Sequence, residues 1–269
     1  LIMLLTSENY YSREANEEYL SVSQYKDFMG TYGKPGCEEY ALSKLNGTWV
    51  EAMEDSTALM VGSYVDAHFE GTLDLFKAQH PCMFKKDGNL KAEYVKANEM
   101  INRCERDALF MQYMSGEKQV IMTADMFGAK WKIKIDSYHP GKCIVDLKTC
   151  QSITKEFYHP DTGHLNFLAE WGYYIQGAVY QKVVEINTGK KLPFFIAAVS
   201  KEKEADIQVI AVEQSLLDEA LTEVEQNVST ILMLKSGAVE PMRCEHCDYC
   251  KHTKVLNRPI WSSELIGEV

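Results

Sequence analysis

The sequence predicts an α/β protein in which a mixed sheet is flanked by helices. Three observations support this prediction. Apolar residues recur with a helical period in several long stretches before and after a central region. That region, residues 119–148, instead alternates apolar and polar residues, as strands do. No internal repeat, low-complexity segment or Pro/Gly-rich linker interrupts the chain, so we expect one domain over residues 1–269.

The first part of the chain is predicted to be helical. Ser21 and Ser23 resemble helix caps and open an amphipathic stretch that runs to Met29. Helical stretches then follow at residues 38–45, 57–78 and 91–113.

The second part mixes strands with helices. Residues 119–127, 130–137 and 143–148 are expected to form a three-stranded meander, with breaks at Gly128 and at Pro140-Gly141. After it come a helix at 166–185, strands at 193–200 and 207–212, and a closing helix at 215–235.

The turn at Pro140-Gly141 is predicted to bring charged side chains together. Asp146 and Lys148 point the same way because strand side chains alternate faces. A three-residue connection, 140–142, pairs residue 139 with 143 and therefore Asp136 with Asp146, with their Cβ atoms roughly 5 Å apart. A two-residue turn would put Asp136 opposite Val145 and break this arrangement.

Two carboxylates and a lysine at one point suit metal-assisted hydrolysis of a phosphodiester. Ordinary charges on a solvated hairpin would give the same triplet. Lys130, Lys132 and Lys134 are expected on the strand face of Asp136, where they would form a basic track into the site or simply the polar face of a half-exposed strand.

Composition limits the class of protein. The net charge of −11 argues against a general nucleic-acid binder, although a metal site brings its own carboxylates. No apolar run approaches the ~20 residues that span a bilayer, and no signal peptide is evident, so we expect a cytoplasmic protein. Eight cysteines without a secretory signal favour metal ligation or free thiols over disulfides.

A second group of candidate ligands lies near the C-terminus. Cys244, Cys247 and Cys250 are each three residues apart, which is a strong metal-ligand pattern. A fourth ligand is needed to close the site. His246 or His252 would favour zinc, and Cys37, just before a helical stretch, is the alternative.

The helical stretch at 166–185 adds Gln176 and Tyr180, which are four residues apart and so share one face. In the order Asp136, Asp146-x-Lys148, Gln176-x-x-x-Tyr180, the chain resembles the PD-(D/E)XK nuclease superfamily. It is most similar to the RecB-like and phage-type, or RecE-like, exonuclease branch, over about residues 21–251. The resemblance implies a restriction-endonuclease-like core at about 57–236, an N-terminal helical part, and a Cys-rich clasp at about 240–254 with Cys37.

The resemblance also implies roles for individual residues. Asp136, Asp146 and the carbonyl of Leu147 would hold one or two Mg²⁺ or Mn²⁺ ions. Lys148 would position the attacking water, and Gln176 and Tyr180 would fix the phosphate or order the lysine.

The third carboxylate ligand is expected on the stretch 57–78. Residues 61–66 resemble the upstream helix of the branch, which usually carries histidine where this chain has Asp66. We expect Asp66 to replace it, because hard cations prefer oxygen ligands. His68 would point elsewhere on a helix, and Glu70 is a weaker candidate.

By analogy with iron–sulfur members of the branch, Cys37, Cys244, Cys247 and Cys250 would bind a [4Fe–4S] cluster, with zinc or no metal as alternatives. The resemblance implies a Mg²⁺-dependent DNA exonuclease, bacterial or phage-encoded. It would act on linear DNA in recombination beside a single-strand annealing protein, as a ring-shaped oligomer. The alternatives are a catalytically inactive DNA-binding or assembly module of the same fold and a zinc-dependent interaction protein.

Overall fold

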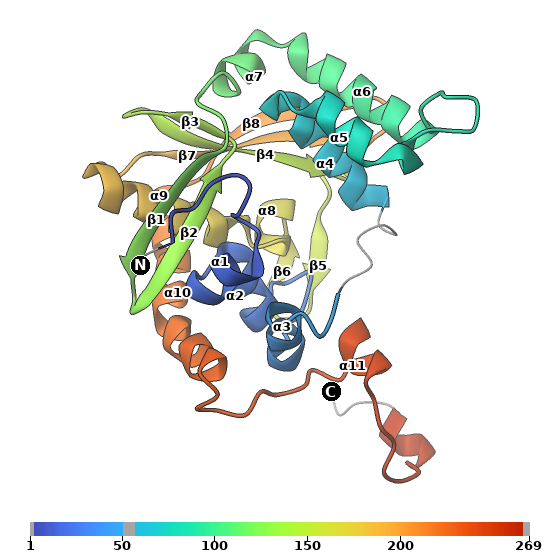
Figure 1. Ribbon diagram of the computed structural model, residues 1–269, viewed down its shortest axis with the longest axis vertical. Coiled ribbons are helices and arrows are strands. Elements are labelled where there is room, and N and C mark those ends of the chain that lie inside the picture. Colours follow the sequence, from blue (N-terminus) through green and yellow to red (C-terminus); the bar gives the residue numbers. More distant parts are fainter. Residues whose placement is uncertain (1–2, 51–56, 266–269) are drawn as a thin grey trace.

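A mixed four-stranded sheet forms the centre of the molecule (Figure 1). The computed structural model describes residues 3–50 and 57–265. The strand order is β3 (Ser137–His139), β4 (Cys143–Cys150), β7 (Phe194–Ser200) and β8 (Ile207–Ala211). β4 and β7 are parallel, and β3 and β8 pair antiparallel at the two edges. The predicted α/β class with a mixed sheet is confirmed.

Helices cover both faces of this sheet (Figure 1). Val145 and Leu147 of β4 pack into a core cluster with residues of α4 (Thr57–Glu70) and α6 (Ala92–Glu105). Ile144 faces the opposite cluster, which contains residues of α9 (Tyr173–Thr188) and α10 (Gln214–Lys235). Because side chains alternate along a strand, Asp146 and Lys148 fall on the α9 side of β4.

The predicted three-stranded meander is wrong in one respect. β1 (Val120–Met126) and β2 (Ala129–Ile135) form a separate antiparallel sheet, and the chain passes through Asp136 into β3. The other edge of β2 is occupied by the N-terminal segment, because Leu20 N donates to Lys130 O at 2.7 Å and Lys132 N donates to Leu20 O at 2.9 Å. Both edges of β2 are therefore paired without β4.

Three predicted helices are each divided in two. Gly71, with φ +80°, separates α4 from α5 (Leu73–Gln79). The Asp107 side chain caps Phe110 N and starts α7 (Ala108–Tyr113) after α6. Gly172, with φ +62°, separates α8 (Phe167–Glu170) from α9. Each break adds a change of direction that the helical period alone does not predict.

The remaining elements complete the molecule. α1 (Arg13–Glu18) and the β5–β6 hairpin (Phe157–His159 and Gly163–Leu165) were not predicted from the sequence. α2 (Val22–Met29) and α3 (Glu38–Leu45) lie where helices were expected. The short elements are η2 (Pro81–Met83), α11 (Asp248–His252) and η3 (Ser262–Leu265), and Met83 and Cys250 of the first two are buried in hydrophobic clusters. Among the described residues, no helix combines the length and apolar character needed to cross a membrane.

Gly177 of α9 marks the closest approach of this helix to the sheet. A Cβ at this position would lie 2.6 Å from Phe194 Cδ1 and 2.8 Å from Leu217 Cδ2. We expect Gly177→Val to lower the free energy of unfolding by about 2 kcal/mol or more, because overpacking displaces buried rings. Urea unfolding measures this. Ile186→Ala, on the exposed side of the same helix, is the control and should change stability by about 0.5 kcal/mol or less. Equal effects of the two substitutions would contradict the packing described here.

Candidate active site and metal centre

Three acidic residues from three elements line one cavity of about 400 Å³. Asp136 lies in the bend between β2 and β3, Asp146 lies on β4, and Asp66 lies on α4. The predicted register is confirmed, because His139 pairs with Cys143 and Ser137 pairs with Val145. Asp136 is thereby held beside Asp146, as the three-residue turn requires.

Asp146 is almost fully buried and is oriented by two side chains. Lys148 Nζ lies 2.5 Å from Asp146 Oδ2, and Gln176 Nε2 donates to Asp146 Oδ1 at 2.6 Å. The ammonium group approaches Oδ2 as an ion pair, and no aligned hydrogen bond from the described residues reaches this oxygen. One buried carboxylate oxygen at the centre of the site is therefore left with an incomplete set of partners.

Asp136 is held by the backbone of the neighbouring strand. Leu147 N donates to Asp136 Oδ2 at 2.8 Å, and Gln119 Nε2 donates to Oδ1 at 3.4 Å. Tyr180 OH donates to Lys134 O at 3.1 Å, two residues before Asp136. Gln176 and Tyr180 thus orient the acidic residues and their backbone. Gln119 was expected only as a strand residue.

The buried carboxylates repel one another. Burial raises the pKa of Asp66 to about 7, and the charge of Asp146 adds to this shift. Burial, followed by the charges of Asp146 and Asp66, raises the pKa of Asp136 well above its usual range. Burial alone would lower the pKa of Lys148, but the charges of Asp146, Tyr173 and Asp136 together outweigh it and hold that pKa above its ordinary value. The cavity therefore favours a positive charge, and Lys148 remains protonated.

The structure places the three candidates for the third ligand differently. Asp66 lines the cavity with Asp136 and Asp146. His68 turns away, and its Nε2 lies 2.8 Å from Glu105 Oε1. Glu70 lines an adjoining cavity of about 320 Å³, which Asp66 and Lys134 also border.

The predicted track of three lysines is wrong for two of them. Lys130 Nζ pairs with Glu18 at 2.8 Å. Lys132 is 1% exposed, and its Nζ donates to Tyr10 O at 2.5 Å and to Asn16 Oδ1 at 2.7 Å. The N-terminal segment covers this strand. Lys132 and Lys134 both line the cavity, but the ammonium group of Lys132 is held by the N-terminal segment.

Two further residues of the cavity were not foreseen. Tyr173, at the start of α9, places its ring centroid 4.9 Å from Lys148 Nζ. On the other side of this ring, Lys26 Nζ lies 5.0 Å from the centroid and donates to Trp171 O at 2.8 Å. Burial, and then the charge of Lys148, lowers the pKa of Lys26 to about 7. Lys26 lies on α2, far from β4 in sequence, so only tertiary packing reveals this contact.

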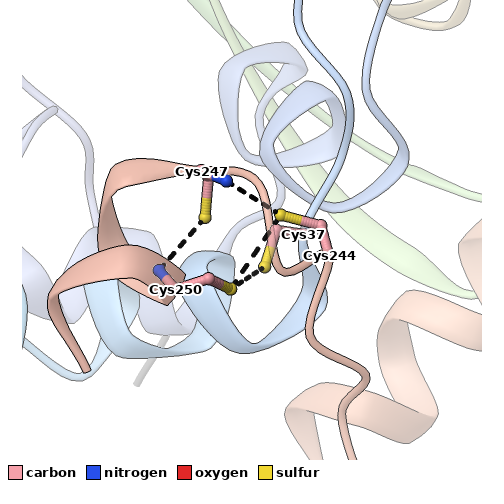
Figure 2. A group of neighbouring side chains, drawn as sticks. All are labelled: Cys37, Cys244, Cys247 and Cys250. Carbon is pink, nitrogen blue, oxygen red and sulfur yellow. Dashed lines mark hydrogen bonds between the residues drawn. The ribbon is translucent and has the colours of Figure 1, made fainter. Parts of the chain in front are cut away.

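Four cysteines from both ends of the chain form a second cluster. The thiols of Cys37, Cys244, Cys247 and Cys250 point toward one another (Figure 2), and their Sγ atoms all lie within 4.8 Å. Cys37 Sγ is 3.6 Å from Cys250 Sγ, and Cys244 Sγ is 3.9 Å from it. Within the described ranges, no other set of three or more Cys, His or acidic ligand atoms reaches this spacing. Asp66, Asp136 and Asp146 are thus more widely spaced.

The surroundings of the cluster hold it in place. Arg243 pairs with Glu39 at 2.7 Å and donates to Cys250 O at 2.9 Å, which ties the C-terminal segment to α3. The ring centroid of His252 lies 5.3 Å from that of Trp49, and His246 is exposed. The fourth position beside the three C-terminal thiols is occupied by Cys37.

The comparisons with known proteins fit this geometry. The family model described as "PDDEXK-like domain of unknown function (DUF3799)" matches residues 21–253. The chain belongs to this PDDEXK-like family. The predicted resemblance to the superfamily and its restriction-endonuclease-like core is confirmed.

A solved structure is similar to the chain over nearly its whole length. The crystal structure of a protein from Eubacterium rectale named "Putative exonuclease" is 58% identical, with a TM-score of 0.96. The match covers 99% of this chain and 100% of that one. No curated protein matches the chain.

Removing the charge of Asp66 tests the electrostatics of the cavity. Because the pKa of Asp66 is raised, its charged form destabilises the folded protein. This destabilisation grows as the pH rises from about 4 to about 7. We therefore expect Asp66→Asn to raise the thermal midpoint of the metal-free protein more at pH 8 than at pH 5.

Thermal unfolding in EDTA at the two pH values measures this effect. Asp74→Asn, at an exposed position of α5, is the control and should change little at either pH. An equal change in the thermal midpoint of Asp66→Asn at both pH values would show that the buried charge of Asp66 does not destabilise the protein.

Proposed function

We propose that this PDDEXK-like protein is a divalent-metal-dependent DNA exonuclease that hydrolyses linear DNA. The main observation that supports this proposal is that one cavity is lined by Asp66, Asp136, Asp146 and Lys148. Carboxylates and lysines gathered in one cavity suit a phosphodiester chain held by a cation. The name of the relative from Eubacterium rectale supports exonuclease activity as the specific reaction.

The acidic residues fit a hard divalent cation. Asp146 Oδ2 lacks an aligned hydrogen bond among the described residues, and the raised pKa values of Asp66 and Asp136 reflect burial and then repulsion by neighbouring carboxylates. Asp66, Asp136, Asp146 and the Leu147 carbonyl would hold Mg²⁺ or Mn²⁺, which prefer oxygen ligands. When bound, such an ion lowers the pKa of a water molecule and stabilises charge on the phosphate.

The remaining side chains orient the reacting groups. Lys148 stays an ammonium group, so it can donate to a water molecule or a phosphate oxygen but cannot accept a proton. Gln176 fixes the rotamer of Asp146, and Leu147 N fixes that of Asp136. Because these contacts exist before substrate binds, little reorganisation is needed in the transition state.

Loss of either central side chain should abolish cleavage. We expect Asp146→Ala and Lys148→Ala each to slow Mg²⁺-dependent degradation of end-labelled linear duplex by about 10²–10³-fold or more. Lys130→Ala is the matched control, because Lys130 pairs with Glu18 at the surface and should leave the rate unchanged.

Covalently closed circular DNA distinguishes exonuclease from endonuclease activity, because an exonuclease needs a DNA end and leaves the circles intact. Unchanged digestion by either cavity variant would rule out this site. If the unaltered protein binds DNA but cleaves none with Mg²⁺ or Mn²⁺, the inactive DNA-binding module is the better account.

We propose that the four cysteines hold a structural metal, and their spacing favours zinc. Tetrahedral zinc with Zn–S bonds of about 2.3 Å separates its thiolates by about 3.8 Å. The Sγ separations of 3.6 and 3.9 Å agree with this value. A [4Fe–4S] cluster places several iron and sulfide atoms between its thiolates and would need a wider cage.

Elemental analysis of protein purified without oxygen should find about one zinc per chain. Cys37→Ser should lose the metal and lower the thermal midpoint, because the metal joins distant segments. Cys82→Ser, which removes an exposed free thiol, is the control. This variant should keep the metal and an unchanged thermal midpoint. Iron together with broad visible absorbance would overturn zinc in favour of the cluster. The recombination role, the annealing-protein partner and the ring-shaped assembly stay predictions from the resemblance.

A further inference from the structure

Lysines and aromatic rings form a row from the catalytic cavity to the β5–β6 hairpin. The hairpin follows directly after β4, the strand of Asp146 and Lys148, and lies beside α8 (Figure 1). We name this row the lysine–aromatic track and define it as Lys26, Tyr173, Trp171, Phe157 and Lys155.

The inner end of the track lies inside the cavity. Lys26, Tyr173 and Lys148 all line it. Lys148 Nζ and Lys26 Nζ lie 4.9 and 5.0 Å from the centroid of the Tyr173 ring. The hydrogen bond from Lys26 Nζ to Trp171 O, at 2.8 Å, joins this end to the loop between α8 and α9.

The outer end of the track is open to solvent. The Trp171 side chain is 42% exposed, and its ring meets the Phe157 ring edge to face at a centroid distance of 6.3 Å. Lys155 Nζ lies 4.8 Å from the Phe157 centroid and donates to Gln151 Oε1 at 2.8 Å, next to the end of β4. Gln151 thus links the outer lysine to the catalytic strand.

Two acidic groups beside the outer end of the track are paired with histidines. Glu170 is buried and lies 2.6 Å from His159 Nε2. Glu156 pairs with His164 at 3.0 Å, and His164 stands opposite Tyr158 in the hairpin. Because neighbouring strand residues face opposite sides, Tyr158 and Phe157 lie on different faces. The track is therefore a local basic and aromatic surface on a chain of net charge −11.

We propose that the lysine–aromatic track binds single-stranded DNA adjacent to the scissile phosphate. This proposal rests on the proposed nuclease function and adds the path of the strand. Trp171 stacks on a base, Phe157 holds the indole in place, and Lys155 pairs with a neighbouring phosphate, while Lys26 holds the backbone of Trp171. Stacking and phosphate contacts of this kind tolerate any base sequence. The track therefore suits an enzyme that degrades DNA regardless of sequence.

Binding measured without cleavage tests the track independently of the chemistry. In an Asp146→Asn background with EDTA, we expect Trp171→Ala and Lys155→Ala each to weaken the binding of a fluorescent oligothymidylate about tenfold. Lys155→Ala should also reduce the salt dependence of log Kd by about 0.7. Lys155→Glu, at an exposed position, should weaken binding further without affecting folding, which thermal unfolding checks.

Two control variants each remove an aromatic ring or a lysine that lies outside the track. Tyr158→Ala removes an exposed ring from the opposite face of the hairpin, and Lys86→Ala removes an exposed lysine from the turn before α6. Both should bind like the background protein. Unchanged binding by the track variants, or an equal loss in the controls, overturns the proposal. Failure of the unaltered protein to cleave any DNA would refute the nuclease function instead, and the binding result would stand separately.

Discussion

The short antiparallel pairing of β3 with β4 is the constraint on which the candidate site depends. Only three residue pairs define it, from His139–Cys143 to Ser137–Val145. A slip of one residue would exchange the faces of β4 and send Asp146 and Lys148 into the apolar cluster beneath α4 and α6. Val145 and Leu147 prevent the slip, because both are buried in that cluster and could not be exchanged for charged groups.

The same register also explains how the acidic side chains are held near each other. Leu147 lies between Asp146 and Lys148, with its side chain in the core and its N–H donating to Asp136. Two consecutive features of one strand, an apolar side chain and a backbone donor, thus hold the carboxylates in place. The raised pKa of Asp136 shows that these contacts offset only part of the effect of burial and of the repulsion by Asp146 and Asp66.

The sequence predicted what depends on local rules. The turn at Pro140–Lys142 sets the register, strand alternation sets the faces of Asp146 and Lys148, and thiol spacing marks Cys244, Cys247 and Cys250. The contacts of Lys26 and Lys132 could not be predicted, because they depend on where the N-terminal segment packs against β2 and α9. The choice of Cys37 over a histidine came from family resemblance alone.

The position of the cysteine centre connects it mechanically to the cavity. Cys37 N donates to Asp27 O at 3.0 Å, and Asp27 follows Lys26 on α2. Loss of the metal would release Cys37 and the C-terminal segment together and loosen the end of the helix that carries Lys26. The state of the proposed metal centre would thereby affect how firmly one wall of the cavity is anchored.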